Sequence, residues 1–277
     1  MITKADICTF GDRGRILLRS QEFICLYPHP RLREYISHYH ITFPTRALMP
    51  DGFTAMPDGC SSLNMAIDAS RMYADLAGPT TKPSIIGGQV NHLEMLVGID
   101  FQPAGLFAFT GIDQSEFLDQ SFPFETVNPV LHKSMAEAIE KAASVYELAA
   151  SFDALLLDNM HTVSRPQVKQ AFLHILETGG NTTARQLSDH VHYSERQLNR
   201  LFRQHVGLSP KSFSRLARIY HAFRLLKDPR NSLTMVSDLA GFHDLSHFTR
   251  DFRLVCGVTP QAYRGNMSGF YNNTAKF

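Results

Sequence analysis

Two stretches of this chain, fifty residues apart, have nearly the same sequence. RLFRQHVGLSPKSF begins at Arg200, and RDFRLVCGVTPQAY begins at Arg250. A long period that occurs twice excludes a coiled coil and a solenoid. The chain is therefore expected to use one small structural unit two times. The positions that recur unchanged are Arg200/Arg250, Phe202/Phe252, Arg203/Arg253, Gly207/Gly257 and Pro210/Pro260.

The length and composition indicate a globular protein of two domains. The 277 residues are enough for two cores, and no apolar run approaches the ~20 residues that span a bilayer. The N-terminus lacks the apolar core of a secretory signal, and we expect a cytoplasmic location. Four cysteines without CxxC spacing predict free, mostly buried thiols. These are Cys8, Cys25, Cys60 and Cys256.

The charge is distributed unevenly along the chain. Residues 1–160 hold 11 lysines and arginines against 19 acidic residues, a balance of −8. Residues 161–277 hold 16 against 7, a balance of +9, and 12 of those 16 cations are arginine. An arginine-rich half favours a polyanion as partner, whereas the acidic half favours a domain that stays off it.

Hydrophobic patterning predicts an α+β chain with a boundary near residues 159–166. Short apolar runs and turn dipeptides over residues 10–105 predict a β-rich sandwich or barrel, with one early helix at residues 31–40. Apolar residues at three-to-four spacing predict a helix from Leu131 to Val145 and a second one through Leu156. Seven helical segments follow Pro166, and Asn181 or Thr182 is expected to cap the second of them.

Each copy of the repeat reads as two short helices joined by a tight turn. This helix-turn-helix arrangement places its second helix in the major groove of DNA. The two reading helices are expected at about residues 194–205 and 244–255. Arginine suits guanine, asparagine suits adenine, and serine or threonine suits phosphates or base edges. The side chains expected to face DNA are Ser194, Glu195, Arg196, Asn199, Arg200 and Arg203 in the first copy, and Asp244, Leu245, Ser246, His247, Thr249, Arg250 and Arg253 in the second.

A long helix between the copies predicts their spacing. From Ser209 to Lys227 it would measure about 28 Å at 1.5 Å per residue. Major-groove surfaces on one side of DNA repeat about every 34 Å. A stiff helix of that length can hold two reading helices in successive grooves.

The residues from 166 to 265 resemble the DNA-binding domain of the AraC/XylS family of bacterial transcription regulators. The matching stretches are LSDHVHYSERQLNRLFRQHVGLSPKSF and VSDLAGFHDLSHFTRDFRLVCGVTPQAYR, with Ser237 where the family has alanine. The resemblance implies a sequence-specific regulator such as an activator, which acts on a double-stranded DNA operator and on RNA polymerase. It further implies that bases are read at Arg196, Asn199 and Arg200, and at Leu245, Ser246, His247, Thr249 and Arg250.

The first 160 residues are similar to the sensory domain of one branch of that family. The stretches that carry this similarity are YPHPRLREYISHYHI, MPDGCSSLNMAI and LVGIDFQPAGLFAFTGIDQSEFLDQSFPFETV. Related domains are cupin-like barrels followed by helices, and they bind a small-molecule effector, form homodimers, or both. The implied organisation is a sensory and dimerisation domain at 1–160, a DNA-binding domain at 161–267 and a frayed tail at 268–277.

Weaker patterns leave alternatives for the N-terminal domain. Arg15 and Arg19 fit a cyclic-dinucleotide pattern, but solvated arginines are the plainer interpretation. Phe101 and Phe107 would line an apolar effector pocket or belong to the core. His38 and His40 lack a glutamate at short interval, so we expect no metal and no cofactor. An enzyme fused to the DNA-binding domain is the other alternative, but no catalytic set emerges, and Cys60 lacks the expected reactive-cysteine motif.

Overall fold

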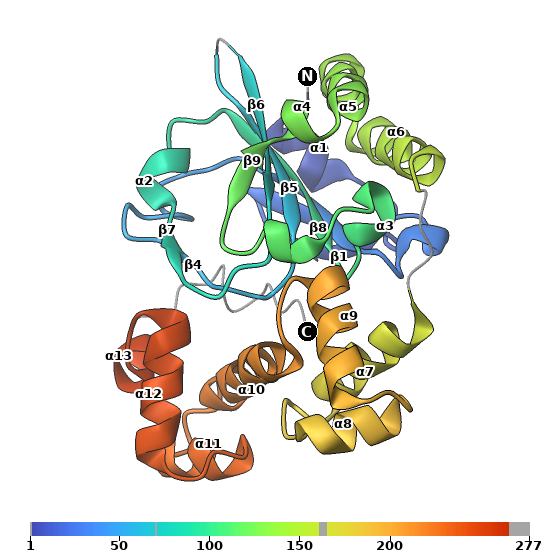
Figure 1. Ribbon diagram of the computed structural model, residues 1–277. Coiled ribbons are helices and arrows are strands. Elements are labelled where there is room, and N and C mark those ends of the chain that lie inside the picture. The colour runs from blue at the N-terminus through green and yellow to red at the C-terminus, as the bar shows by residue number, and fades with distance from the viewer. Residues whose placement is uncertain (1, 70, 161–164, 266–277) are drawn as a thin grey trace.

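The computed structural model describes residues 2–69, 71–160 and 165–265, and it places a β-sheet region above a helical region (Figure 1). Buried apolar side chains form two clusters, and each cluster belongs essentially to one region. The predicted fold class is confirmed, because a β-rich N-terminal part with helices precedes an all-helical C-terminal part. The domain limits stay a prediction. Residues 161–164, within the expected boundary, and the expected frayed tail lie outside the described residues.

Within residues 2–69 and 71–160, the sheet region contains nine strands. They are β1 (Ile16–Arg19), β2 (Phe23–Leu26), β3 (Ile36–Thr42), β4 (Thr54–Ala55), β5 (Ser62–Ile67), β6 (Met72–Ala77), β7 (Ser84–Ile85), β8 (Met95–Phe101) and β9 (Ser121–Pro123). Seven of them form one antiparallel sheet in the order β1-β2-β3-β8-β5-β6-β9, and β4 pairs with β7. Because β8 enters between β3 and β5, the centre of the sheet joins segments that are far apart in the sequence.

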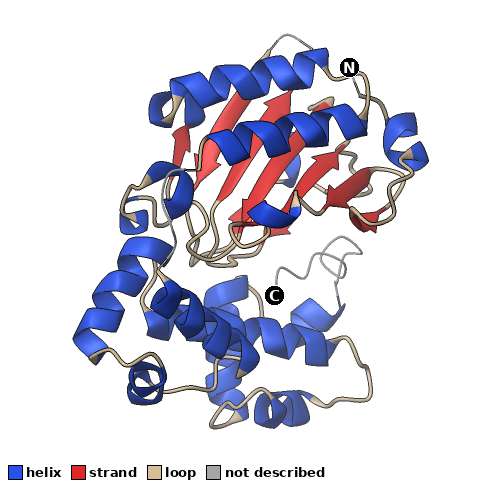
Figure 2. Cartoon of the chain, turned by 90° about the vertical axis from the view of Figure 1, so that its right-hand side faces the viewer, coloured by secondary structure: helices blue, strands red, loops and turns tan. Residues whose placement is uncertain are grey.

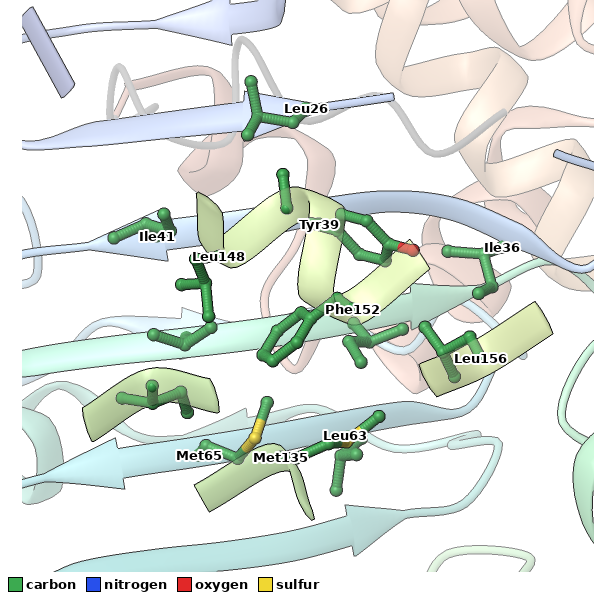
Figure 3. Close-up of a cluster of buried hydrophobic side chains, with 14 of the residues drawn as sticks. Leu26, Ile36, Tyr39, Ile41, Leu63, Met65, Met135, Leu148, Phe152 and Leu156 are labelled. Atoms are coloured by element: carbon green, nitrogen blue, oxygen red, sulfur yellow. The ribbon is translucent and has the colours of Figure 1, made fainter. Parts of the chain in front are cut away.

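Two helices cover one face of the main sheet (Figure 2). They are α5 (Pro129–Lys141) and α6 (Val145–Asp158). Successive side chains of a strand point to opposite faces, so alternate residues of the central strands meet these helices. Phe152 of α6 lies against Tyr39 of β3, with ring centroids 5.8 Å apart (Figure 3). The expected single helix through Val145 is wrong, because Ala142 ends α5 and Ser144 caps α6.

The helix predicted at residues 31–40 is also wrong. Pro30–Leu32 forms one 3-10 turn, η1, and β3 begins at Ile36 after a short turn. The segment is rich in β-branched and aromatic residues, and β3 pairs on both sides, with β2 and β8. Local strand propensity and pairing on both sides therefore both favour a strand over the expected helix. Further short helices occur at α1 (Lys4–Thr9), α2 (Gly87–Val90), α3 (Phe107–Thr110), η2 (Gln114–Glu116) and α4 (Phe124–Val127).

The helical region contains the seven predicted helices within residues 165–265. Thr183 caps the second of these helices through the Gln186 amide, so the expected cap at Asn181 or Thr182 is wrong. The helices are α7 (Pro166–Glu177), α8 (Ala184–His190), α9 (Glu195–Val206), α10 (Pro210–Leu226), α11 (Leu233–Leu239), α12 (Leu245–Cys256) and α13 (Pro260–Gly265). None of the described helices is both long and apolar enough to cross a membrane.

The repeated sequence forms two helix-turn-helix units, α8–α9 and α11–α12. Each second helix ends at a glycine in the left-handed region, Gly207 with φ of 86° and Gly257 with φ of 75°. Glycine adopts this conformation without a steric penalty, so the recurring glycines stop both helices at equivalent positions. The two units therefore share the position at which the second helix ends, as well as its polar and apolar faces.

Helix α10 connects the two units and packs against both. It begins after its cap Ser209, and its 17 residues span about 26 Å at 1.5 Å per residue. Phe213 contacts Phe202 of α9, with ring centroids 5.7 Å apart, and Phe223 contacts Phe252 of α12 at 5.1 Å. The spacer predicted between the units is thus continuous and anchored at each end.

The sheet region rests on the first unit. The ring of Phe107 lies 4.0 Å, between centroids, from the ring of His205 near the end of α9. Gly59 adopts φ of 67°, and a Cβ there would lie 2.9 Å from Cδ1 of Leu208. Lys169 of α7 forms a 3.0 Å ion pair with Glu34. The C-terminal end of α9 is therefore held by the N-terminal region.

Acid is expected to weaken this contact through His205. Burial, with the Arg165 guanidinium adding to it and Asp113 opposing it, lowers the pKa of His205 to about 4. The unfolded histidine, with a pKa near 6.5, binds a proton more readily. Stability is thus complete above about pH 6.5 and declines as the pH falls towards 4. Thermal unfolding across this range should show the decline, and it should be smaller in His205→Gln. The exposed His92, changed to Gln, provides the control, and equal profiles for both variants would refute the assignment.

Candidate nucleic-acid interface

Helix α9 presents a polar face to solvent in the full chain. Its apolar side holds Leu198, Leu201 and Phe202 in the core. The predicted reading residues lie opposite, so the N-terminal region does not cover them. Glu195, Arg196, Asn199, Arg200 and Arg203 are all exposed.

Helix α12 presents an equivalent face in the second unit. Phe248 and Phe252 are fully buried, and they fix the helix against α10 and α11. The predicted residues lie along the free side of the helix. Leu245, Ser246, Arg250 and Arg253 are exposed, while His247 and Thr249 are half-buried.

Ser194 and Asp244 have a structural role that the prediction did not include. The Ser194 hydroxyl accepts a hydrogen bond from the Gln197 backbone amide, and the Asp244 carboxylate accepts one from the His247 amide at 2.6 Å. The bond from the His247 backbone, followed by the one from the His243 side chain, lowers the pKa of Asp244. Both residues are helix caps, so contact with DNA would use oxygen atoms that already accept bonds.

Cations from the spacer helix extend the basic surface. A cleft of about 1250 Å³ separates the start of α10 from α12, and Lys211, Arg215 and Arg218 line it together with Arg250 and Arg253. The sequence analysis missed the three α10 cations. Their spacing of three to four residues places them on one helix face, and this pattern is readable from sequence.

Both reading helices point the same way relative to the sheet region. At the C-terminal end of α9, a Cβ on Gly207 would lie 2.7 Å from Pro79, and at the end of α12 a Cβ on Gly257 would lie 3.3 Å from Pro83. The N-terminal halves of the two helices therefore face away from the sheet, as Figure 1 shows. In helix-turn-helix proteins the N-terminal residues of this helix contact the bases.

The weaker N-terminal candidates do not come together as one site. Arg15 Nη2 forms a 2.9 Å ion pair with Asp153, so its charge is already compensated, and Arg19 donates to the Phe10 carbonyl. Phe101 lies in the sheet core, whereas Phe107 is a contact to the helical region. Arg15 and Arg19 therefore do not form a pair of uncommitted guanidiniums that could bind a phosphate together.

The sheet contains a histidine–carboxylate cluster that sequence reasoning did not assemble. Nε2 of His38 lies 3.1 Å from Asp100 Oδ2, and Nε2 of His40 lies 3.8 Å from the same atom. The carboxylate comes from β8, which pairs with β3, so no short sequence interval could reveal it. The described residues contain no group of three or more ligands arranged to hold a metal.

None of the four cysteines is joined in a disulfide, and three of them are buried. Cys60, the residue considered for an enzymatic alternative, is 7% exposed and adjoins Gly59 at the contact with the helical region. Its backbone amide donates to Asp58. The position is that of a core side chain at an interface.

Comparisons with known protein families match two parts of this chain. Residues 187–266 match a helix-turn-helix domain, and residues 25–123 match a domain of unknown function, DUF6597. The first match covers both reading helices and the spacer between them. The second covers most of the sheet.

Individual relatives are similar to the C-terminal part. The uncharacterised HTH-type transcriptional regulator YobQ of Bacillus subtilis is 33% identical over 85 residues, 31% of this chain and 35% of that protein. The HTH-type transcriptional activator RhaR of Yersinia pseudotuberculosis is 36% identical over 70 residues, 25% of this chain and 24% of that protein. The matched part of this chain therefore spans about a quarter to a third of the length of these two relatives.

Solved structures also match this chain over different shares of its length. The DNA-binding domain of AdpA, in complex with a target DNA, is 25% identical with a TM-score of 0.34, covering 37% of this chain and 92% of that one. ToxT from Vibrio cholerae is 10% identical with a TM-score of 0.42, covering 80% of this chain and 96% of that one.

Proposed function

We propose that this chain, whose C-terminal part is a helix-turn-helix domain of the AraC type, is a sequence-specific transcription regulator that reads two successive major grooves. The observation that carries the proposal is the repeated, exposed polar face of α9 and α12. Arg200 and Arg250 occupy equivalent positions on these faces, and neither is covered by the N-terminal region. Arginine at such a position can donate two hydrogen bonds to guanine.

The spacer helix supports the two-groove geometry. Its length of about 26 Å, together with the offset of each unit, is compatible with groove surfaces about 34 Å apart. Basic side chains line the cleft between α10 and α12, beside the exposed face of α12, and would be available there to the phosphates of bound DNA. Phosphate contacts fix the register of a protein on DNA, while base contacts select the sequence.

Footprinting of the full chain on its selected operator tests the proposal. Protection is expected over two major-groove segments about one helical turn apart on one side of the duplex. Duplexes recovered from a random library supply the operator. Protection over a single groove, or equal binding to selected and scrambled duplexes, would contradict the proposed function.

The N-terminal region is proposed to sense a ligand, to form dimers, or both. Its contacts with the end of α9 support this role, because a change near Phe107 would reach the first reading helix directly through His205. Dimerisation would increase affinity by placing two chains on neighbouring sites. Binding by the isolated helical region, compared with the full chain, separates these contributions. Weaker binding by the fragment favours dimerisation, and tighter binding favours an inhibitory N-terminal region.

Removal of Lys211 is expected to weaken DNA binding without changing sequence preference. Lys211 is exposed at the start of α10 and lines the cleft, so it is placed for a phosphate. Losing one phosphate contact lowers the slope of log K against log salt by about 1. Titrations of Lys211→Ala at several salt concentrations measure this slope. Lys133→Ala removes an exposed cation from α5 and should leave the slope unchanged.

A further inference from the structure

A buried carboxylate distinguishes the second reading helix from the first. Asp251 of α12 is 9% exposed, and the equivalent position of α9 holds Leu201, which is 3% exposed. The two units therefore differ at a core position of an otherwise matched repeat. A charge at a buried position is costly unless it is paired, so the partners of Asp251 define its role.

Asp251 has partners on two helices. Its Oδ2 atom lies 3.3 Å from Nε2 of His247, one turn earlier on α12, and 3.7 Å from Nε of Arg215 on α10. The carboxylate therefore joins the spacer helix to a residue of the reading face. The ring of Phe242 also meets His247 edge-on, with centroids 5.5 Å apart.

The surroundings of this carboxylate are basic. Among the described residues that line the cleft, Asp251 is the one acidic side chain, and Lys211, Arg215, Arg218, Arg250 and Arg253 are the cations. An ionised carboxylate accepts hydrogen bonds and donates none. When His247 is neutral, a carboxylate 3.3 Å from Nε2 favours the proton on that nitrogen, which leaves Nδ1 as an acceptor.

We propose that Asp251 is a positioning residue that fixes His247 in the Nε2–H form, so that the second unit selects adenine or cytosine at one position of one strand by the exocyclic amino group. This inference rests on the proposed function and deepens it. In the major groove the hydrogen-bond donors are the amino groups of adenine and cytosine, whereas guanine and thymine offer acceptors. The His247 side chain keeps 28% of its surface exposed and lines the cleft between α10 and α12, so part of its ring is open to a ligand there.

The first unit has no equivalent device. Gln197 stands where His247 stands in the second unit, and Leu201 replaces Asp251. A glutamine amide carries both a donor and an acceptor and can present either one. In the second unit His247 thus presents only an acceptor, whereas Gln197 at the equivalent position of the first unit can present a donor or an acceptor.

Nitrogen NMR of the full chain tests the tautomer without DNA. With histidine labelled and the buffer mildly alkaline, where imidazole is neutral, we expect the proton of His247 on Nε2. Asp251→Asn should produce a mixture of the two forms, because an amide can donate as well as accept. A proton on Nδ1 in the wild-type chain overturns the proposal, and so does an unchanged spectrum in Asp251→Asn.

Competition binding with duplexes changed one base pair at a time tests the selection. The wild-type chain should prefer adenine or cytosine at one position of the second half-site by about 3- to 10-fold, as loss of one hydrogen bond implies. His247→Ala and Asp251→Asn should each lose the preference at that position, and the double variant should lose no more. Asp238→Asn, at an exposed aspartate of α11, makes the same charge change and should keep the preference.

Other results separate this inference from the proposed function. Absence of any sequence preference in the wild-type chain refutes the proposed function, whereas the NMR result still decides the tautomer. Uniformly weaker binding of Asp251→Asn to every duplex, with the preference retained, assigns Asp251 a structural role and overturns the inference. A preference for guanine or thymine at the position sensitive to His247 overturns it as well.

Discussion

Replacement of Arg200 or Arg250 with alanine is expected to weaken binding to the operator by about 1–3 kcal/mol, which corresponds to about 5- to 150-fold in affinity. Each arginine occupies the same position in its unit and is exposed in the full chain. The loss should be confined to specific sites, because base contacts carry sequence information. Equilibrium titration with selected and scrambled duplexes measures the affinity for specific sites and the affinity for nonspecific DNA.

Two comparisons make this result interpretable. Lys133→Ala removes one positive charge from the N-terminal region, so it controls for the change in overall charge. Each arginine variant should lose discrimination within its own half of the operator and retain it in the other half. If both variants bound selected and scrambled duplexes as the wild type does, neither arginine would be a reading residue.

Replacement of Phe213 with alanine is expected to lower the free energy of unfolding by about 3–5 kcal/mol. Phe213 is fully buried, contacts Phe202 of the first unit, and lies beneath Gly59 of the N-terminal region. The smaller side chain would leave a cavity where the spacer, the reading helix and the sheet region meet. Chemical denaturation measures the change.

A matched substitution separates cavity formation from loss of apolar surface. Leu254→Ala truncates a side chain that is 55% exposed on α12, and its effect should stay within about 0.5 kcal/mol. If Phe213→Ala were equally mild, the helical region would tolerate the cavity by collapse. The junction would then be less tightly packed than its burial indicates.

The helical region could be predicted from sequence because its helix ends and faces are specified by residues that are close together in the sequence. Cap residues such as Ser209, stop glycines such as Gly207, and apolar spacing each specify a helix end or face within a few residues. The same local patterns would also have identified Lys211 and Arg215, since their spacing places them on one side of the spacer. Comparison of the two copies would have identified Asp251, because the repeat aligns it with Leu201.

The sheet region was harder to predict because its strands depend on pairing between residues that are far apart in the sequence. β3 is a strand through its pairing with β8, about sixty residues later, and no local feature of residues 31–40 reveals that partner. The proximity of Asp100 to His38 and His40 and the stacking of Phe107 on His205 follow from the same kind of long-range contact. Effector residues proposed from short patterns, such as Arg15, could not include Asp153, the partner that neutralises it.

The contacts between the sheet region and the first unit have a consequence for how the second unit, and the operator half that it is proposed to read, can change. Phe107, Gly59 and Glu34 meet residues that precede the middle of α10, whereas the second unit begins beyond the end of that helix. A recombination or a graft that exchanged the chain from Ser232 onward would replace the second helix-turn-helix unit and keep these three contacts, while the contact of Gly257 with Pro83 would be exchanged with the unit. A chain built in this way can change one of its two units while the sheet region stays joined to the other.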